Sequence, residues 1–430
     1  MAGGIRMVLP EPSDLGVDPY VVARRPDSVR SVYQPIVALG PRRELVGFEA
    51  LARWPAAPMV DPVAVFAAAR AEGLLAEVDW ACRVSAVAGA MERNLGRSHT
   101  LFVNVEPDAL RHTRLPNTDF AEVVDRARGE LRIILELTER AITDDPSSLL
   151  RAVDTARSNG WGIALDDVGS NPQSLALLPL IQPDVIKLDR SLLEPEDCAV
   201  AEEIAALVRE HARSSGASVL AEGIETTAHL RRAIELGARY GQGRMLGAPG
   251  ALPALIPAPS EPIPLITEGN SHVPTSPGAL LDVIPSSRFD SDRSIGTIDR
   301  VLDGMENTRD PLTVLCAVDT RSPEASRVAR RVARLAERHP FVAVIGAEED
   351  RSVAGRFGSA ARWSGARDGD PINNEWALVA IGSRTEVALL ARSAADQPAG
   401  DVDLTVSYDR PVVRAAGRSL SRRVTAIAGI

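Results

Sequence analysis

Residues 162–189 read GIALDDVGSNPQSLALLPLIQPDVIKLD, and they show the pattern on which the fold depends. Two short apolar runs, GIALDD (162–167) and DVIKLD (184–189), each end in acidic residues. A short apolar run bounded by turn signals is typical of a buried strand. Strands that alternate with helical segments indicate a parallel sheet covered by helices.

The same alternation continues on both sides of this stretch. Asp61-Pro62 predicts a helix start, because Asp is a good N-cap and Pro suits the first helical position. Amphipathic segments at 147–160 and 201–213 each run into a glycine. Seven or eight such units in about 225 residues favour a closed (β/α) barrel over an open sheet. The further apolar runs are VYQPIVAL (32–39), LFVNV (101–105), RIILEL (132–137), SVLAE (218–222) and ARYGQG (238–243).

The sequence divides into four regions. We expect residues 1–28 to form a loose, flexible arm and residues 29–255 to form the barrel. Residues 256–289 are rich in Pro and Ser and predict a semi-extended linker. Residues 290–430 predict a second, smaller α/β unit. Its expected strands are PLTVLCAVD (311–319), FVAVIG (341–346) and WALVAIG (376–382), and its expected helix is EASRVARRVARLAERH (324–339).

Composition excludes several classes of protein. The 430 residues carry a formal net charge of −10, which argues against a nucleic-acid polymer or an anionic membrane as partner. Three cysteines without a CxxC pair favour a reducing, cytoplasmic compartment. The first 16 residues lack the apolar core of a signal peptide, and we expect no membrane-spanning segment.

Polar residues gather at the ends of the apolar runs. In a barrel of parallel strands these ends meet on one face, where active sites lie. We therefore expect scattered residues to converge in one pocket, with Glu49 of VGFEALARW added to the set. The run ends are Asn104, Glu136, Asp166 and Asp167, Lys187, Glu222 and Gln242.

Five carboxylates in one pocket require a compensating cation. Oxygen ligands select Mg²⁺ or Mn²⁺ rather than zinc. The adjacent Asp166 and Asp167 suit two ions that share a carboxylate, an arrangement that activates water for phosphoester hydrolysis. Lys187 would hold that water or offset charge, and Arg53 would reach a phosphate oxygen. These residues predict two-metal phosphoester hydrolysis.

Each residue taken singly has a simpler interpretation. An acid after a strand is usually a helix cap or a solvated loop residue, and Asn104 fits a turn. Glu49 would pair with Arg53 and do nothing more. Six strand ends that all carry such groups favour the functional interpretation. The six histidines share no metal-binding spacing, so we interpret them as solvated. They are His99, His112, His211, His229, His272 and His339.

Residues 29–250 resemble the EAL domain, the bacterial cyclic di-GMP phosphodiesterase module. The family's name motif is Glu49-Ala50-Leu51 within FEALARW. The order and spacing of the other motifs also match. These are YQPIV (33–37), FVNVEP (102–107), ELTE (136–139), DDVGS (166–170), IKLD (186–189), AEGIET (221–226) and QGRMLGAP (242–249).

The resemblance implies a TIM-like (β/α)₈ barrel with one strand reversed and two Mg²⁺ or Mn²⁺ ions that open cyclic di-GMP to linear pGpG. The catalytic residues would be Glu49, Lys187, Asp167 and Glu222, with Lys187 holding the attacking water. The metal ligands would be Glu49, Asn104, Glu136, Asp166, Asp167 and Glu222. Gln34, Leu51 and Arg53 would contact the dinucleotide, with Gln242 and Glu225 in support, and Glu139 would anchor the loop after the fourth strand.

One stretch departs from the family pattern. Residues 168–174, VGSNPQS, replace a loop that supports the second metal and the dimer contacts of the family. Asn171 stands where the family has glycine and can replace it only in a left-handed or extended backbone, and Pro172 restricts φ at the next position. We therefore expect reduced or differently regulated activity, and tight homodimerisation is in doubt.

The second unit resembles the DICT domain, a sensory module found beside cyclic di-GMP enzymes. NEWALVAIGSRTEVALLAR (374–392) carries most of this resemblance. Glu375-Trp376 is either a functional pair or packing, and Cys316, inside an apolar run, is expected to be an inert core thiol. The sequence thus predicts a phosphodiesterase modulated by its C-terminal unit. A cyclic di-GMP receptor without turnover and a protein-binding scaffold are the alternatives.

Overall fold

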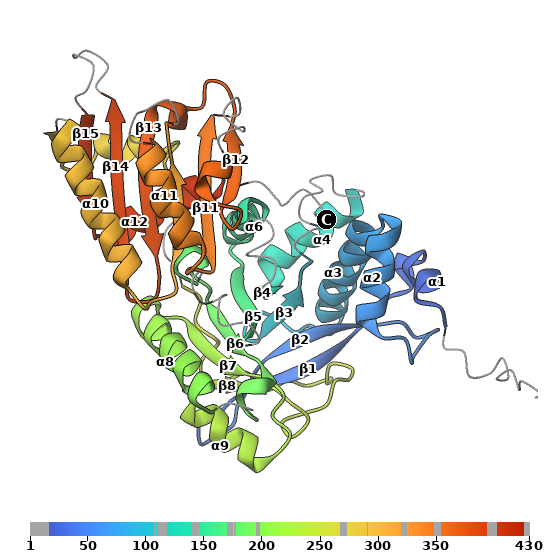
Figure 1. Ribbon diagram of the computed structural model, residues 1–430. Helices are drawn as coiled ribbons and strands as arrows, with labels where there is room; N and C mark the ends of the chain where they lie inside the picture. The colour runs from blue at the N-terminus through green and yellow to red at the C-terminus, as the bar shows by residue number, and fades with distance from the viewer. Residues whose placement is uncertain are drawn as a thin grey trace, which may run out of the picture.

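The computed structural model shows two units, drawn in blue to green and in yellow to red in Figure 1. The first is an eight-stranded barrel and the second a seven-stranded sheet with helices on both faces. The described residues are 17–106, 109, 118–138, 146–169, 175, 178–194, 198–266, 273–289, 291–319, 325–347, 354–393 and 402–424.

The first unit confirms the expected barrel. Its strands are β1 (Arg30–Ala38), β2 (Leu45–Arg53), β3 (Thr100–Asn104), β4 (Arg132–Thr138), β5 (Gly162–Val168), β6 (Val185–Leu188), β7 (Ser218–Ala221) and β8 (Tyr240–Gly241). They close in sequence order. β1 runs antiparallel to both β2 and β8, so one strand is reversed, whereas the pairs from β2 to β8 are parallel.

Helices surround the barrel as α2 (Pro62–Glu72), α3 (Leu75–Glu92), α4 (Thr118–Glu130), α6 (Pro146–Ser158), α7 (Leu178–Ile181), α8 (Cys198–Ser215) and α9 (Thr227–Glu235). Asp61 caps α2 by accepting a hydrogen bond from the Val63 amide at 3.0 Å, as the Asp-Pro pair predicts. Gly73 ends the same helix with a φ of 71°, a conformation that glycine adopts without strain.

The structure corrects the expected loose arm at residues 17–28. These residues form helix α1 (Pro19–Ala23) and the 3₁₀ turn η1 (Pro26–Ser28). Val22 and Ala23 are buried in a small apolar cluster that also contains Val65 of α2. Burial of these side chains holds the segment on the barrel, while residues 1–16 lie outside the described part of the chain.

The structure also corrects the expected linker. Ile263 is fully buried in the barrel interior, in one cluster with Phe102 and Ile134. Asp184 accepts a hydrogen bond from the Ile266 amide at 2.5 Å, and Arg132 donates to the Ile263 carbonyl at 2.5 Å. These contacts lie at the N-terminal ends of β4 and β6. Residues 257–266, which we name the plug segment, therefore close the end of the barrel opposite the expected site.

The second unit contains the expected strands and helix, and more. Its sheet has the order β12-β11-β10-β13-β14-β15-β9, in which β10, β11 and β12 are parallel and the other pairs antiparallel. The strands are β9 (Ser287–Phe289), β10 (Thr313–Ala317), β11 (Phe341–Ala347), β12 (Arg362–Ala366), β13 (Glu375–Ile381), β14 (Glu386–Ser393) and β15 (Val402–Ser407). The helices are α10 (Ser291–Asn307), α11 (Ala325–Ala336) and α12 (Arg410–Ser421). Turn η5 (Pro277–Asp282) precedes β9 within the expected linker region.

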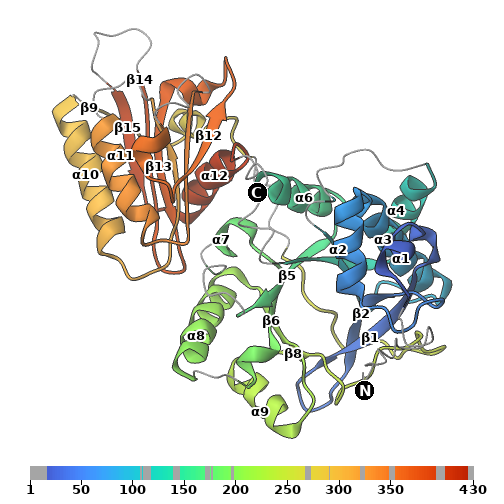
Figure 2. The same ribbon diagram turned by 45° about the vertical axis from the view of Figure 1, so that its right-hand side comes forward.

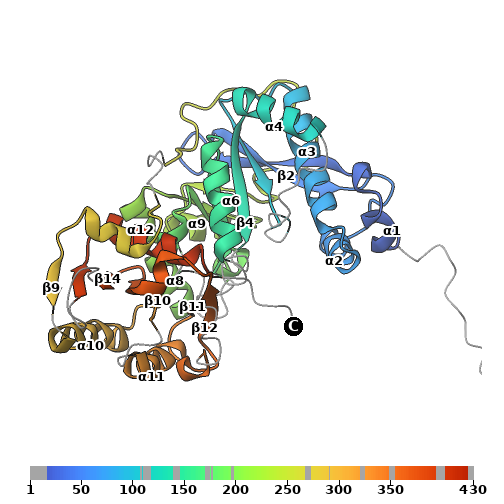
Figure 3. The same ribbon diagram turned by 90° about the horizontal axis from the view of Figure 1, so that it is seen from above.

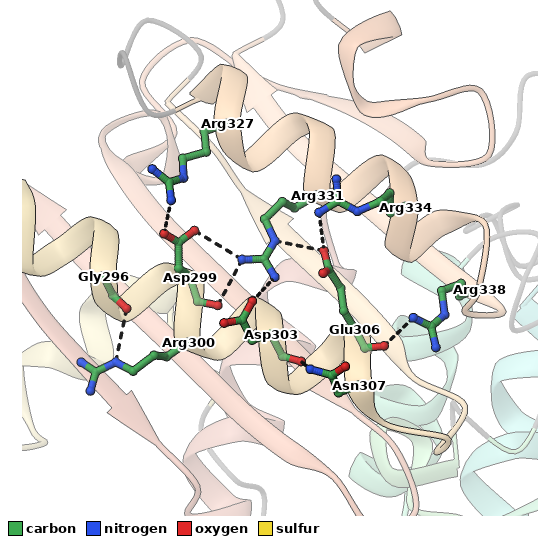
Figure 4. Close-up of polar contacts among 10 residues, drawn as sticks. All are labelled: Gly296, Asp299, Arg300, Asp303, Glu306, Asn307, Arg327, Arg331, Arg334 and Arg338. Carbon is green, nitrogen blue, oxygen red and sulfur yellow. Dashed lines mark hydrogen bonds and ion pairs between the residues drawn. The ribbon is translucent and has the colours of Figure 1, made fainter.

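Helices α10 and α11 cover one face of this sheet and α12 covers the other (Figure 3). Figure 4 shows the ion pairs that join α10 to α11. Arg331 contacts Asp299, Asp303 and Glu306 at 3.3, 2.6 and 3.0 Å. Since its side chain is only 11% exposed, this guanidinium depends on the three acids for its solvation.

Helix α12 also joins the two units. It lies on the side of the second unit that faces α6 and α7 (Figure 2). Arg418 of α12 donates to Asp154 of α6 at 2.6 Å, and Arg422 contacts the same carboxylate. A Cβ on Gly417 would lie 2.6 Å from the Ile381 side chain and 3.0 Å from that of Leu180. Glycine at this position therefore lets α12 fit between the second sheet and α7.

Within the described residues, no helix combines the length and the apolar character needed to cross a membrane.

Candidate functional site

The expected strand-end residues do converge at one end of the barrel. Glu49 lies in β2 opposite Gln34 of β1, and Asn104 lies opposite Glu136 at the ends of β3 and β4. Asp166 and Asp167 belong to the end of β5, and Lys187 belongs to β6. Glu222 and Gln242 directly follow β7 and β8. The alternation of side chains along each strand aims these groups into the barrel mouth, while their neighbours Leu135, Leu165 and Leu188 point to the helices.

Lys187 occupies the centre of this group. Its side chain is fully buried, and Nζ lies 2.5 Å from Glu136 Oε1, 2.7 Å from Glu222 Oε1 and 3.1 Å from Asp166 Oδ1. Glu49 Oε2 is 3.8 Å away. Lys187 is also the only lysine of the chain. Four carboxylates from four strands therefore surround one ammonium group.

Amide side chains fix the orientation of Glu49. Asn104 Nδ2 donates to Glu49 Oε1 at 2.9 Å, and Gln242 Nε2 donates to Glu49 Oε2 at 2.6 Å. Gln242 Nε2 also lies 2.9 Å from Gln34 Oε1, and Gln34 donates in turn to the Gly247 carbonyl. Both oxygens of Glu49 are thus held by neutral donors, which leaves their negative charge in place.

The pKa values of the carboxyl groups in this cluster are shifted in different directions. Burial would raise the pKa of Glu49, but Lys187 and the hydrogen bonds from Gln242 and Asn104 hold it below its ordinary value. Burial and then the charge of Glu49 raise the pKa of Glu136 well above its ordinary value. Burial likewise raises the pKa of Glu222, to about 8. For Lys187, burial would lower the pKa, but the surrounding carboxylates outweigh it and raise the pKa well above its ordinary value.

The donor set fits divalent cations. One oxygen each of Asp166, Asp167 and Glu222 lies within 4.8 Å of the others, a spacing that one ion can span. With Glu49 and Glu136, the site holds five carboxylates and one ammonium group, so the ionised cluster keeps a negative charge that hard metal ions offset. Asp167 has a φ of 58°, and its amide donates to Asp166 Oδ1 at 3.0 Å. This left-handed backbone turns two consecutive carboxylates toward the same side of the strand.

A hollow of about 800 Å³ lies above the cluster. Eight predicted site residues line it, namely Gln34, Glu49, Leu51, Arg53, Asp166, Glu222, Glu225 and Gln242. Arg53 donates to the Ala52 carbonyl at 2.7 Å, so its guanidinium lies along its own strand. Glu225 forms ion pairs with Arg190 at 3.2 Å and Arg244 at 3.9 Å.

Among the residues lining this hollow that the sequence interpretation missed, two carry large side chains with polar groups. Arg244 and Trp54 also line it, and both fall inside quoted motifs, QGRMLGAP and FEALARW. Their positions next to Gln242 and Arg53 were the available signal. Two other expectations lie outside the described residues: the anchor Glu139, and residues 170–174 of the departing loop.

In the second unit, Glu375 has a structural role. It is buried and accepts hydrogen bonds from Ser276 Oγ at 2.6 Å and the Gly278 amide at 2.8 Å. It therefore fastens η5 to β13. Cys316 is buried, which confirms its place in the core, and burial raises the pKa of its thiol to about 12, as expected of an inert thiol.

The solvated interpretation is wrong for four of the histidines. His99, His211, His229 and His339 are all buried. His99 Nε2 lies 2.9 Å from the Pro257 carbonyl, and His229 contacts Glu194 and the Gly223 carbonyl. The Pro257 carbonyl was not visible in the sequence as a partner of His99, because it comes from a segment 158 residues away. His112 and His272 lie outside the described residues.

Comparison with known proteins agrees with this geometry. A family model for the EAL domain matches residues 22–249. The cyclic di-GMP phosphodiesterase RocR of Pseudomonas aeruginosa is 30% identical over 225 residues, which cover 50% of this chain and 56% of RocR. The probable cyclic di-GMP phosphodiesterase PdeB of Escherichia coli K12 is 30% identical over 216 residues, which cover 49% of this chain and 40% of PdeB.

Among solved structures, BlrP1 of Klebsiella pneumoniae in a complex with manganese and cyclic di-GMP is 29% identical, with a TM-score of 0.45. The match covers 52% of this chain and 56% of BlrP1. Three of the curated relatives are matched over 28–56% of their own length, so the chain spans about half or less of these proteins.

Proposed function

The chain belongs to the EAL domain family, and from that membership we propose that it is a phosphodiesterase that hydrolyses cyclic di-GMP to linear pGpG. The observation that carries this proposal is the convergence of four carboxylates on Lys187, with Asp167 beside them. Motif residues that are far apart in the sequence form one polar cluster beneath one hollow. A barrel that only bound protein partners would not need this buried charge, which is costly to maintain.

We propose that two Mg²⁺ or Mn²⁺ ions bind this cluster. Their ligands would be Glu49, Asn104, Glu136, Asp166, Asp167 and Glu222. When bound, such ions acidify water and offset the charge of the phosphodiester. Asn104 already donates through Nδ2 to Glu49, so its carbonyl oxygen is the atom left to serve as a ligand.

Lys187 orients the attacking water. Its raised pKa keeps the ammonium protonated at neutral pH, so Nζ donates hydrogen bonds and does not act as a base. Glu136 and Glu222 lie within 2.7 Å of Nζ and hold it in place. Water adds to one phosphorus, and the ribose 3′ oxygen leaves with a proton.

The hollow holds the dinucleotide. Arg53 would leave the Ala52 carbonyl and pair with a phosphate oxygen, a charge-assisted contact that is stronger than the one it gives up. Leu51 supplies an apolar surface beside it, and Gln34 and Gln242 offer amide groups. Glu225, held by Arg190 and Arg244, supports the rim.

A second candidate is a cyclic di-GMP receptor without turnover. The sequence VGSNPQS at 168–174 favours it, because this stretch follows the metal-binding pair Asp166-Asp167 and departs from the family pattern. A barrel of this kind would keep the hollow and the dinucleotide contacts but would lose the second ion.

The C-terminal unit, which resembles a DICT domain, would modulate the barrel through the contact of α12 with α6 and α7. The free thiols Cys82 and Cys316 fit a cytoplasmic enzyme. A homodimer is compatible with the family resemblance.

Separation of nucleotides after incubation of the full chain with cyclic di-GMP and Mg²⁺ or Mn²⁺ tests the proposal. We expect pGpG from the native protein and at least a hundredfold less from Glu49→Ala and Asp167→Asn. Glu210→Gln, which changes an exposed acid on α8, is the matched control and should keep full activity. Tight binding of cyclic di-GMP without pGpG would favour the receptor, and no binding would exclude both functions.

A further inference from the structure

A second cavity of about 790 Å³ lies outside the barrel, between α3, α4 and α6. Its floor consists of the outward-facing side chains Val103 of β3 and Ile133 and Leu135 of β4. Alanines of the flanking helices face this floor, Ala127 from α4 and Ala152 from α6. Larger side chains normally fill the space between barrel and helices, so these small residues leave it open.

Aromatic side chains add to the apolar lining. Trp80 of α3 and Trp161, which precedes β5, both line the cavity. Arg83 stacks on the Trp80 ring at 3.5 Å and pairs with the buried Asp79. Its charge is therefore already neutralised. A cavity of this size with an apolar lining and a few polar groups is typical of a small-molecule site.

The rim of this cavity is positively charged. Arg128 of α4, Arg151 of α6 and Arg422 after α12 all line it, together with Asp125 and Asp154, and Arg128 pairs with Asp125 at 3.3 Å. Arg151 donates only to the neutral Ser148 hydroxyl at 2.7 Å among the hydrogen bonds of the described residues. Asp154 forms ion pairs with both Arg418 and Arg422, so one carboxylate faces two guanidinium groups. The rim therefore keeps excess positive charge on a chain whose net charge is −10.

We propose that this cavity binds an amphiphilic anion, with an apolar body of the fatty-acid class inside and one anionic group at the arginine rim. The apolar floor excludes ligands that are polar throughout, and the rim disfavours amphiphilic cations. This inference does not depend on the phosphodiesterase function, since the cavity lies on the other side of the β3 and β4 strands from the site cluster.

The position of Arg422 gives such a ligand a specific effect. Arg422 belongs to the second unit, and it reaches Asp154 of the barrel at the same rim. A bound anion attracts Arg422 and competes with Asp154 for it. The ligand is therefore placed to alter the contact between the two units.

Calorimetry on the full chain with dodecanoate tests the proposal. We expect 1:1 binding that is lost in Ala152→Phe, which fills the cavity, and that is roughly two- to fivefold weaker in Arg151→Gln. Arg213→Gln, an exposed arginine on α8, is the matched control and should bind as the native protein does. Retained binding in Ala152→Phe would overturn the proposal, as would no binding of dodecanoate to the native chain. If circular dichroism shows that Ala152→Phe is unfolded, the comparison of Arg151→Gln with Arg213→Gln decides.

Two further measurements test the charge of the ligand and the position at which it binds. Dodecanol and dodecyltrimethylammonium should bind at least fivefold more weakly than dodecanoate, and equal binding would overturn the assignment of an anion.

Dodecanoate should shift the tryptophan fluorescence to shorter wavelength, because it removes water from the cavity. Trp161→Phe should reduce this shift and Trp363→Phe, in the second unit, should not; the reverse result would place the ligand elsewhere.

Discussion

Lys187 shows how one side chain organises the site. Every other member of the 48 Lys and Arg residues is arginine, yet the fully buried position holds lysine. A compact ammonium group with three donors fits in the small space between several carboxylates, whereas the larger planar guanidinium holds its donors in a fixed fork and needs more room. We infer that this position requires lysine for its shape as well as its charge.

Most of this cluster could be predicted at the residue scale. Asn104, Glu136 and Asp166 follow apolar runs directly, and barrel topology alone brings such positions together. The ion pairs of Glu225 with Arg190 and Arg244 could not be predicted, because they join three separate loops. Loop positions carry no periodic signal from which such contacts follow.

Metal binding should depend on pH through Glu136 and Glu222, because both are proposed ligands whose pKa values are raised. The raised pKa of Glu222, about 8, means that Glu222 is protonated at neutral pH and must lose this proton to bind a cation. The affinity for Mg²⁺ should therefore fall as the pH is lowered from 9 to 6, by up to about tenfold per pH unit for each proton displaced. Calorimetry in buffers of different ionisation enthalpy measures both the affinity and the protons released. A constant affinity over this range would refute this prediction.

At the scale of elements, sequence patterns predicted most barrel strands but not β2 or the plug segment. The β2 sequence LVGFEALAR is rich in Glu, Ala and Leu, which favour helices, and only its pairing with β1 and β3 makes it a strand. The plug segment has the composition of a solvated linker. Its burial depends on a distant partner, the open end of the barrel.

Ile263→Ala tests the plug segment. The substitution leaves a cavity in the barrel interior and should lower the free energy of unfolding by about 2–5 kcal/mol. Urea unfolding followed by circular dichroism measures this loss. Ile234→Ala on α9, where the side chain is 50% exposed, is the control and should cost far less. Equal effects of the two changes would show that the segment does not support the barrel.

Arg331→Met tests the ion pairs between α10 and α11. Three acids lose their shared partner, so the second unit should lose about 1–2 kcal/mol of stability. The difference should shrink in 1 M NaCl, since salt screens the remaining repulsion among the acids. Thermal unfolding at low and high salt provides the measurement, with the exposed Arg330→Met as control. A loss that is the same at both salt concentrations would contradict an electrostatic origin.

At the scale of the whole molecule, α12 makes the two units one body. A continuous apolar cluster runs from the outer face of the barrel, through Leu180 and Leu420, to Ile381 of the second sheet. The sequence predicted only a semi-extended linker between the two units, because burial at their contact surface produces no periodic pattern in the sequence.

Asp154→Ala should loosen this contact. It leaves Arg418, whose burial already lowers its pKa, without a carboxylate and should cost about 2–4 kcal/mol. We expect two thermal transitions in place of one and a larger radius of gyration in solution scattering. Adding Arg418→Met to the Asp154→Ala variant should restore part of the lost stability, because the second change removes the unpaired charge. A double variant as unstable as the sum of the single ones would contradict this pairing.

The most direct test of the barrel site uses its single lysine. Growth on lysine labelled with ¹³C at Cε alone labels Lys187 at one carbon, so the NMR spectrum contains one lysine side-chain signal. We predict that Mn²⁺ broadens this signal and that Mg²⁺ shifts it, because the ions would bind the carboxylates that contact Nζ, and that Asp167→Asn weakens both effects. A Lys187 signal that stays sharp and unmoved at saturating Mn²⁺ would contradict a metal site at the barrel mouth.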